Sequence, residues 1–340
     1  MKKAILVILL VCTVSTSATA DPFTNPADIN NDGVVDFKDL AILAGNWMWE
    51  IPGPQGMVFV DIPGGTFERG DHSGNGDQDA QPVHTVTISP FKISKYETTN
   101  AQYAEYLNSA KADGLITITN GVVHGLIDGI SHEYVHTSSS KSISQITFSD
   151  DQFSVRNRNG LSMANHPVVA ITWYGAKAFC DYYGYRLPTE AEWECAERGG
   201  SYTPYFIYPW DGDSLDFSKL NCCFQNPLGI SYPPTTPVDY YPAYGYGLCG
   251  MAGNVSEWCS DWWDPRYYES SPQQDPQGPA DGTKRSVRGG CWGCDALQCR
   301  TASRAPRSPD WFCPYGANGF RPAYGAQGNS EAVTMTETTQ

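Results

Sequence analysis

The residues of this sequence with the most reactive side chains are its cysteines. Ten remain beyond the first twenty positions: Cys180, Cys195, Cys222, Cys223, Cys249, Cys259, Cys291, Cys294, Cys299 and Cys313. Thiolates are nucleophiles and ligands for soft metals. An even number of cysteines in an oxidising compartment instead predicts disulfides, whose connectivity a sequence cannot define. Any crosslinks would fall in the C-terminal half.

A second group of possible ligands lies near the N-terminus, between positions 28 and 39. Oxygen-bearing side chains recur at the spacing of a twelve-residue Ca²⁺ loop, a glycine permits its sharp turn, and one backbone carbonyl completes the set. The residues are Asp28, Asn30, Asp32, Gly33, Val34 (through its carbonyl), Asp36 and Asp39. This pattern predicts calcium binding, and the alternative is an acidic, solvated linker.

Capping signals and hydrophobic periodicity locate the elements that would position such residues. Helices are expected over 100–109, behind Thr99, and over 173–183. A third helix should begin at Thr189, because Thr189 and Glu192 form a capping box. Strands are expected at 57–60 and 84–88. Two hairpins are expected between 112 and 165, and little periodicity remains beyond 201.

Composition and charge narrow the class of protein. Only 17% of the residues are charged, while glycine (33) and proline (24) are abundant, which indicates an irregular, loop-rich fold. The net charge of −15 argues against nucleic-acid binding, which needs a basic surface.

The N-terminus resembles a secretory signal. Lys2 and Lys3 precede an apolar run over 4–14 and small residues at 18–20. The run is too short to span a bilayer, so we expect an exported protein that is periplasmic, at the cell surface or secreted, with no membrane span in the mature chain. The expected division is a signal peptide (1–20), a calcium-binding segment (21–50), a linker (51–56), a main domain (57–325) and a disordered tail (326–340).

Seven segments in order resemble the formylglycine-generating (sulfatase-modifying factor) family. They are Ile62–Phe67 (IPGGTF), Tyr96–Tyr103 (YETTNAQY), Arg186–Glu194 (RLPTEAEWE), Gly245–Leu248 (GYGL), Met251–Trp258 (MAGNVSEW), Arg288–Gly290 (RGG) and Asn318–Arg321 (NGFR). The resemblance implies one α+β domain, related to C-type lectin folds, with little regular secondary structure. The N-terminal loop resembles one half of a dockerin, an EF-hand-like module, of which a complete copy has two loops.

The family resemblance implies a redox centre at Cys294 and Cys299. In catalytic members two cysteines at this spacing bind Cu(I) and use O₂ to oxidise a sulfatase cysteine to formylglycine, and soft thiolates suit Cu(I). The sequence departs from those members in having Cys291 after the Gly-Gly pair, Gln298 before the second cysteine and Ser256 in the Asn-x-x-Glu segment. Cys294 could therefore instead be one end of a structural disulfide.

The resemblance also implies calcium in the main domain. Asn254 and Glu257, with the carbonyls of Gly253 and Val255, match a family Ca²⁺ site of hard oxygen donors. A bland alternative is a turn in which these side chains only cap backbone groups. A further family site would take Asn221 and the carbonyl of Cys222, although its acidic partner is missing from 226–237.

Two functions remain open on the sequence alone. The first is a Cu(I)- and O₂-dependent oxidase whose partner is a sulfatase polypeptide. The second is a non-catalytic binding or structural module of the same fold, joined through its calcium loop to a cohesin-like or other surface protein.

Overall fold

The computed structural model describes residues 53–325, apart from positions 75, 77, 201–203, 231–233 and 314–316. The chain divides into two units, Met1–Ile51 and Pro52–Gln340, and all the described residues belong to the second. The predicted signal peptide, the calcium loop between 28 and 39, the start of the linker and the tail from 326 lie outside the described residues.

The described part of the chain contains three α-helices: α3 (Asn100–Ala112), α4 (Trp173–Tyr182) and α5 (Glu190–Arg198). Each begins behind a threonine whose hydroxyl accepts the N–H of the third helical residue, a donor that a helix leaves unpaired. These caps are Thr99, Thr172 and Thr189. Gln102 and Glu192 complete capping boxes on α3 and α5. All three predicted helices are confirmed, and α3 extends further than predicted.

The described strands are short and fall into six small sheets. Three sheets have the orders β1–β4–β16, β5–β6–β7 and β14–β13–β12–β15, and the other three are the pairs β2–β3, β8–β9 and β10–β11. Pairing is antiparallel except between β12 and β15. The bounds of the strands and short 3₁₀ helices are β1 (Phe59–Ile62), β2 (Gly65–Arg69), η2 (Gln78–Ala80), β3 (His84–Ile88), β4 (Phe91–Ser94), β5 (Ile116–Thr119), β6 (Val122–Ile127), β7 (Ile130–His136), β8 (Ile146–Ser149), β9 (Gln152–Val155), β10 (Asn157–Arg158), β11 (Leu161–Ser162), β12 (Ser256–Trp262), η3 (Tyr267–Glu269), β13 (Arg285–Arg288), η4 (Ala296–Cys299), β14 (Ala305–Arg307), β15 (Asn318–Gly319) and β16 (Ala323–Tyr324).

Two strand predictions need correction. The first strand begins at Phe59 rather than 57, because a turn uses the N–H of Met57 to bind the carbonyl of Pro54. Between 112 and 165 the chain forms a three-stranded sheet and two hairpins, not two hairpins alone. The missed reversal is an Asn/Asp-Gly turn, a common hairpin signal: Asn120 and Asp128, each followed by glycine, have positive φ.

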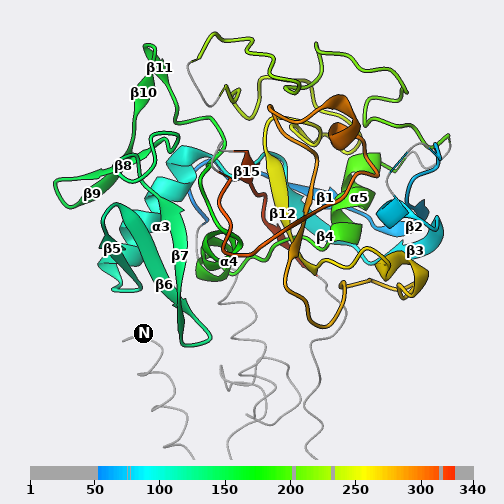
Figure 1. Ribbon diagram of the computed structural model, residues 1–340, viewed down its shortest axis with the longest axis horizontal. Helices are drawn as coiled ribbons and strands as arrows, with labels where there is room; N and C mark the ends of the chain where they lie inside the picture. Colours follow the sequence, from blue (N-terminus) through cyan, green and yellow to red (C-terminus); the bar gives the residue numbers. More distant parts are fainter. Residues whose placement is uncertain are drawn as a thin grey trace, which may run out of the picture. The chain divides into compact units, whose positions relative to one another are not determined.

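The buried interior has two main parts. One packs Tyr103 of α3 and Phe179 of α4 against Phe320. The other packs Trp193 of α5 against a group that includes Val86 of β3. In Figure 1 the sheet β5–β7 lies on the side of α3 and α4, whereas β2 and β3 lie on the side of α5. Large aromatic side chains therefore contribute to the packing of both parts.

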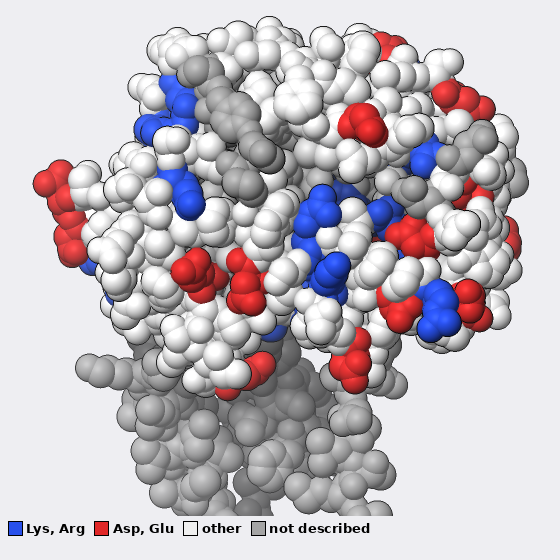
Figure 2. All heavy atoms as spheres, viewed as in Figure 1, with Lys and Arg blue, Asp and Glu red and all other residues white. Residues whose placement is uncertain are grey.

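Few of the residues on the visible surface are charged. Figure 2 shows a face that is mostly uncharged, with acidic and basic groups scattered between neutral residues. No helix among the described residues is long and apolar enough to cross a membrane.

Candidate functional site

The two predicted copper ligands lie on the loop that follows β13. Gly290 has φ of +69°, and a Cβ atom there would lie 2.6 Å from Sγ of Cys299 and 2.7 Å from the carbonyl oxygen of Gln298. Glycine permits both this backbone conformation and this close approach. The Gly-Gly pair therefore lets the loop fold back onto η4, which carries Cys299.

A buried arginine holds the two ends of this loop together. Arg288 donates to Oε2 of Glu194 on α5 (2.6 Å) and to the carbonyls of Thr301 (3.0 Å) and Ser303 (2.9 Å), beyond η4. Burial alone would raise the pKa of Glu194, but Arg198 and Arg288 lower it to about 2. The carboxylate is therefore charged at neutral pH and anchors Arg288.

The structure joins Cys294 to Cys291 in a disulfide. Cys294 is half-buried, whereas Cys299 is a buried free thiol. Cu(I) needs two thiolates, and in this form only Cys299 of the predicted pair can provide one. Cys294 and Cys299 therefore do not fit Cu(I) until the Cys291–Cys294 bond is reduced.

Two further thiols lie beside Cys299. Sγ of Cys222 is 3.1 Å from Sγ of Cys223. A hydrogen bond with the Cys299 thiol, followed by burial, raises the pKa of Cys222 far above its ordinary value. The N–H of Cys223 donates to the carbonyl of Cys294 (2.8 Å). In Figure 1 the orange segment near 290–300 accordingly lies among the yellow-green loops that precede β12.

Cys294 lines a cavity of about 50 Å³, large enough for a few waters. Three arginines contribute to its wall: Arg288, Arg304 and Arg307. Glu190 binds Arg304 (Nε–Oε1, 2.5 Å), but the buried Nε of Arg307 has no hydrogen-bond partner. Nη1 of Arg307 donates to the carbonyl of Pro306 (2.8 Å), and the guanidinium lies over the ring of Trp311 (5.1 Å to its centroid).

The structure engages the predicted calcium ligand Glu257 in another way. Arg321 binds both of its carboxylate oxygens (2.6 and 2.7 Å), and the indole N–H of Trp193 donates to Oε2 (2.8 Å). Asn254 instead donates to Oε2 of Glu97 (2.9 Å), and Oδ1 of Asn254 accepts from the N–H of Thr236 (2.9 Å). The carboxylate in contact with Asn254 is thus that of Glu97.

Glu97 is the functional candidate that the sequence did not reveal. Burial, followed by repulsion from Glu257, raises its pKa to about 8. Asn221 is also buried here, 3.4 Å (Nδ2) from Oδ1 of Asn254, and Oδ1 of Asn221 has no hydrogen-bond partner. The carbonyl of Asn221 accepts from the N–H of Asn254 (2.7 Å), while that of Cys222 accepts from the N–H of Gln225 (3.0 Å).

The carbonyls of Gly253 and Val255 lie in the same turn as Asn254. Within the described ranges, no group of three or more His, Cys, Asp or Glu side chains is arranged to hold a metal ion. The calcium ligand sets of the main domain stay predictions. What the structure adds is that the two sets share one place, since Asn221 touches Asn254.

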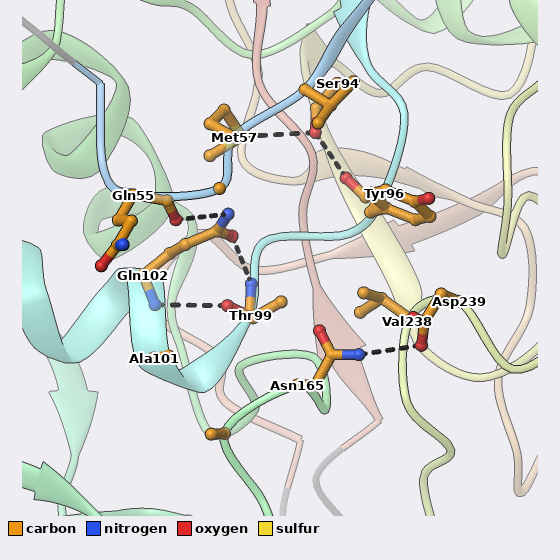
Figure 3. Close-up of a pocket in the computed structure, with 13 residues that line it drawn as sticks. Gln55, Met57, Ser94, Tyr96, Thr99, Ala101, Gln102, Asn165, Val238 and Asp239 are labelled. Atoms are coloured by element: carbon orange, nitrogen blue, oxygen red, sulfur yellow. Dashed lines mark hydrogen bonds between the residues drawn. The ribbon is translucent and has the colours of Figure 1, made fainter.

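A larger cavity, of about 300 Å³ and with no cysteine in its lining, lies between β4, the start of α3 and the segment near 238. Figure 3 shows the polar groups that line it, including the amide of Gln102 and the pair formed by Asn165 and Asp239 (Nδ2–Oδ1, 2.8 Å). The side chains of Tyr96 and Gln55 also border it. Its size is at the lower end of the range for ligand pockets, and its lining is mostly uncharged.

A family model described as "Sulfatase-modifying factor enzyme 1-like domain" matches residues 52–325. The formylglycine-generating enzyme of Streptomyces coelicolor is 35% identical over 273 residues, which cover 74% of this chain and 84% of that protein. A Chlamydia caviae protein named serine/threonine-protein kinase pkn1 is 36% identical over 260 residues, or 74% of this chain. The chain spans only 35% of the length of that kinase-named relative.

A solved structure supports the fold. The chain superposes on PvdO from Pseudomonas aeruginosa with a TM-score of 0.57 and 23% identity, covering 79% of this chain and 98% of that one. This likeness concerns the fold alone, which is mostly sheet with few helices.

Proposed function

Because the chain belongs to the sulfatase-modifying factor enzyme 1-like domain family, we propose that it is an exported oxidoreductase of the formylglycine-generating type. Its substrate is a cysteine in a sulfatase polypeptide, which it oxidises with O₂. The similarity to the Streptomyces coelicolor enzyme supports this proposal, because the shared region covers 84% of that protein.

The observation that carries the proposal is the position of Cys294. This residue lines an arginine-walled cavity together with Gly290 and packs against the group that contains the Cys299 thiol. Once the bond to Cys291 is reduced, Cys294 and Cys299 would be the two thiolates that hold Cu(I). When bound, Cu(I) would supply the O₂ chemistry. Arg307 lines the same cavity and would place positive charge beside a Cys294 thiolate.

A Cu(I) titration of wild type and three serine variants tests this proposal. Cys291→Ser leaves Cys294 without its disulfide partner, so this variant should bind one Cu(I) without a reductant. Wild type should bind Cu(I) only after reduction, and Cys294→Ser and Cys299→Ser should not bind it in either state. Cys223→Ser, a half-buried cysteine of the same region, is the matched control and should behave as wild type.

The activity is measured on a synthetic peptide of the Cys-x-Pro-x-Arg type, with O₂ and a reductant. Mass spectrometry should detect the aldehyde that replaces the cysteine thiol, and hydrazide capture should confirm it. If Cys291→Ser neither binds Cu(I) nor forms the aldehyde while it stays folded, the oxidase proposal is wrong.

A second candidate function is a non-catalytic binding module. Two observations favour it: the bond between Cys291 and Cys294 removes one copper ligand, and the 300 Å³ cavity with its uncharged amides suits a neutral polar ligand. In this case the N-terminal loop (Asp28 to Asp39) would bind Ca²⁺ and join the protein to a cohesin-like or other surface partner. In the main domain, Asn254, Asn221 and Glu97 would supply oxygen ligands for a structural Ca²⁺.

A further inference from the structure

Six of the ten cysteines beyond position 20 gather in one region of the molecule. One buried group contains Cys222 and Cys299, with Cys223 packed against it, and a second contains Cys291 and Cys313. Cys294 packs against both groups. The Cys291–Cys294 disulfide, a Cys-x-x-Cys arrangement around Trp292 and Gly293, thus lies near the free thiols of both groups. These are Cys222, Cys223 and Cys299 in the first group and Cys313 in the second.

The two cysteines of the disulfide differ in their exposure to solvent. Cys291 is buried (6% exposed), whereas Cys294 is half-buried and lines the arginine-walled cavity. An attacking thiol approaching from solvent therefore reaches Cys294 first. Cys291 is then the leaving group, and it departs into a group that already contains the Cys313 thiol.

Two exposed apolar side chains lie near Cys294, outside the arginine-walled cavity. Phe224 is 70% exposed and Leu297 is 59% exposed. Phe224 has φ of +57°, an unfavourable conformation for a bulky residue. It is held there by the bond from its N–H to the carbonyl of Trp292 (2.8 Å), and the two rings meet edge to face, 5.6 Å apart. Because the ring of Phe224 is exposed, packing in the core does not explain why an aromatic residue occupies this position.

We propose that Cys291–Cys294 is a thiol–disulfide exchange centre for cysteine-containing polypeptides, which dock on Phe224 and Leu297. This activity goes beyond the oxidase proposed above, because it needs neither copper nor O₂.

The exchange balances in two steps. A polypeptide thiolate attacks Sγ of Cys294, the S–S bond breaks, and the electron pair leaves on Sγ of Cys291, which takes up a proton. A second thiolate of the polypeptide then attacks the polypeptide sulfur of the mixed disulfide, and Cys294 leaves with the electrons. The polypeptide gains a disulfide, and Cys291 and Cys294 become thiols. A low-molecular-weight disulfide, such as oxidised glutathione, reoxidises the pair for the next cycle.

The charged groups around the cavity favour exchange at Cys294. Arg288, Arg304 and Arg307 line the cavity together with Cys294. Positive charge beside a sulfur stabilises its departing thiolate.

The test uses the full oxidised chain and a reduced synthetic peptide that has one cysteine on each side of a phenylalanine. The reaction runs without oxygen and with a Cu(I) chelator, is quenched with acid, and is followed by alkylation and mass spectrometry. The expected result is one peptide disulfide formed for each pair of alkylated Cys291 and Cys294. Cys294→Ser and Cys291→Ser should abolish this exchange.

Phe224→Ala tests the docking surface. Its rate of exchange should fall about tenfold, as expected when an apolar contact of one aromatic ring is lost. Leu126→Ala is the matched control, because Leu126 of β6 is 67% exposed and remote in sequence, and its rate should match wild type. The proposal is overturned if folded wild type leaves Cys291 and Cys294 unalkylated, or if peptide oxidation is unchanged in Cys294→Ser.

The absence of O₂ and the Cu(I) chelator distinguish disulfide exchange from the oxidase activity proposed above. Aldehyde formation needs O₂ and Cu(I) and would fail under these conditions even if the oxidase proposal is right. Disulfide exchange would proceed under them even if the chain never binds copper.

Discussion

Replacing Gly290 with alanine tests whether close packing of the Gly-Gly loop on η4 shapes the cysteine region. Two costs add in this variant. The φ of +69° is unfavourable for alanine, which costs about 1 kcal/mol. The new Cβ would also lie 2.7 Å from the carbonyl oxygen of Gln298 and 2.6 Å from Sγ of Cys299. Both separations are shorter than van der Waals contact, and relieving them costs about 1–3 kcal/mol more.

Gly114→Ala is the matched control. Gly114 has φ of +72°, and nothing lies within 4 Å of a Cβ there, so this variant should lose about 1 kcal/mol and no more. Gly290→Ala should lose about 2–4 kcal/mol of unfolding free energy by urea denaturation. It should also make the buried Cys299 thiol react faster with a thiol reagent, because the loop must move away from η4. Equal losses in the two variants would refute the packing argument.

Three further predictions concern charge and ligands. Burial lowers the pKa of His166 to about 4, below its ordinary 6.5, so the contribution of the neutral imidazole to stability is complete above pH 6.5 and is lost as the pH falls through 4. Over this window the free energy of unfolding of wild type should decline about 1.4 kcal/mol per pH unit more steeply than that of His166→Gln. Parallel pH dependences of the two proteins in urea denaturation would contradict this prediction. Arg321→Leu should lower the free energy of unfolding by about 3–5 kcal/mol in urea denaturation, because it leaves the buried carboxylate of Glu257 without its charged partner. Adding Glu257→Gln should recover part of this loss. A loss below about 1 kcal/mol in Arg321→Leu would show that the ion pair contributes little to stability. Saturating Ca²⁺ should stabilise wild type by about 3 kcal/mol in thermal or urea unfolding at a hundredfold excess over Kd; the same gain in Glu97→Gln would exclude Glu97 as a ligand.

The helices were predictable because their signals are local. Thr99 and Thr189 each cap a helix whose third residue returns the bond, and both partners lie within one turn of sequence. Strand β3 alternates polar and buried residues in the same local way. The extra strand between 112 and 165 was missed although Asn120-Gly121 and Asp128-Gly129 are turn dipeptides with the expected positive φ. The signal for this strand is therefore as local as the capping signals of the helices.

The partner of Asn254 could not be predicted, because the contact is long-range. The spacing of Asn254 and Glu257 suggests a shared ligand set, but β12 begins at Ser256, and Glu257 on this strand is bound by Arg321 and by Trp193 of α5. The carboxylate that reaches Asn254 comes from Glu97, 157 positions away. A motif read from one short stretch of sequence contains no information about which distant side chain completes it.

The partner of Cys294 could not be predicted from the sequence either. Closing a loop between Cys294 and Cys291, or between Cys294 and Cys299, differs in chain entropy by less than about 1 kcal/mol. Spacing alone therefore cannot choose between a disulfide and a metal-binding pair. The choice comes from the surrounding frame, in which Gly290 packs against Cys299 and the Cys299 thiol bonds to that of Cys222. With Cys299 turned toward Cys222, Cys294 is bonded to Cys291, and the chemistry of this site depends on whether that bond is closed.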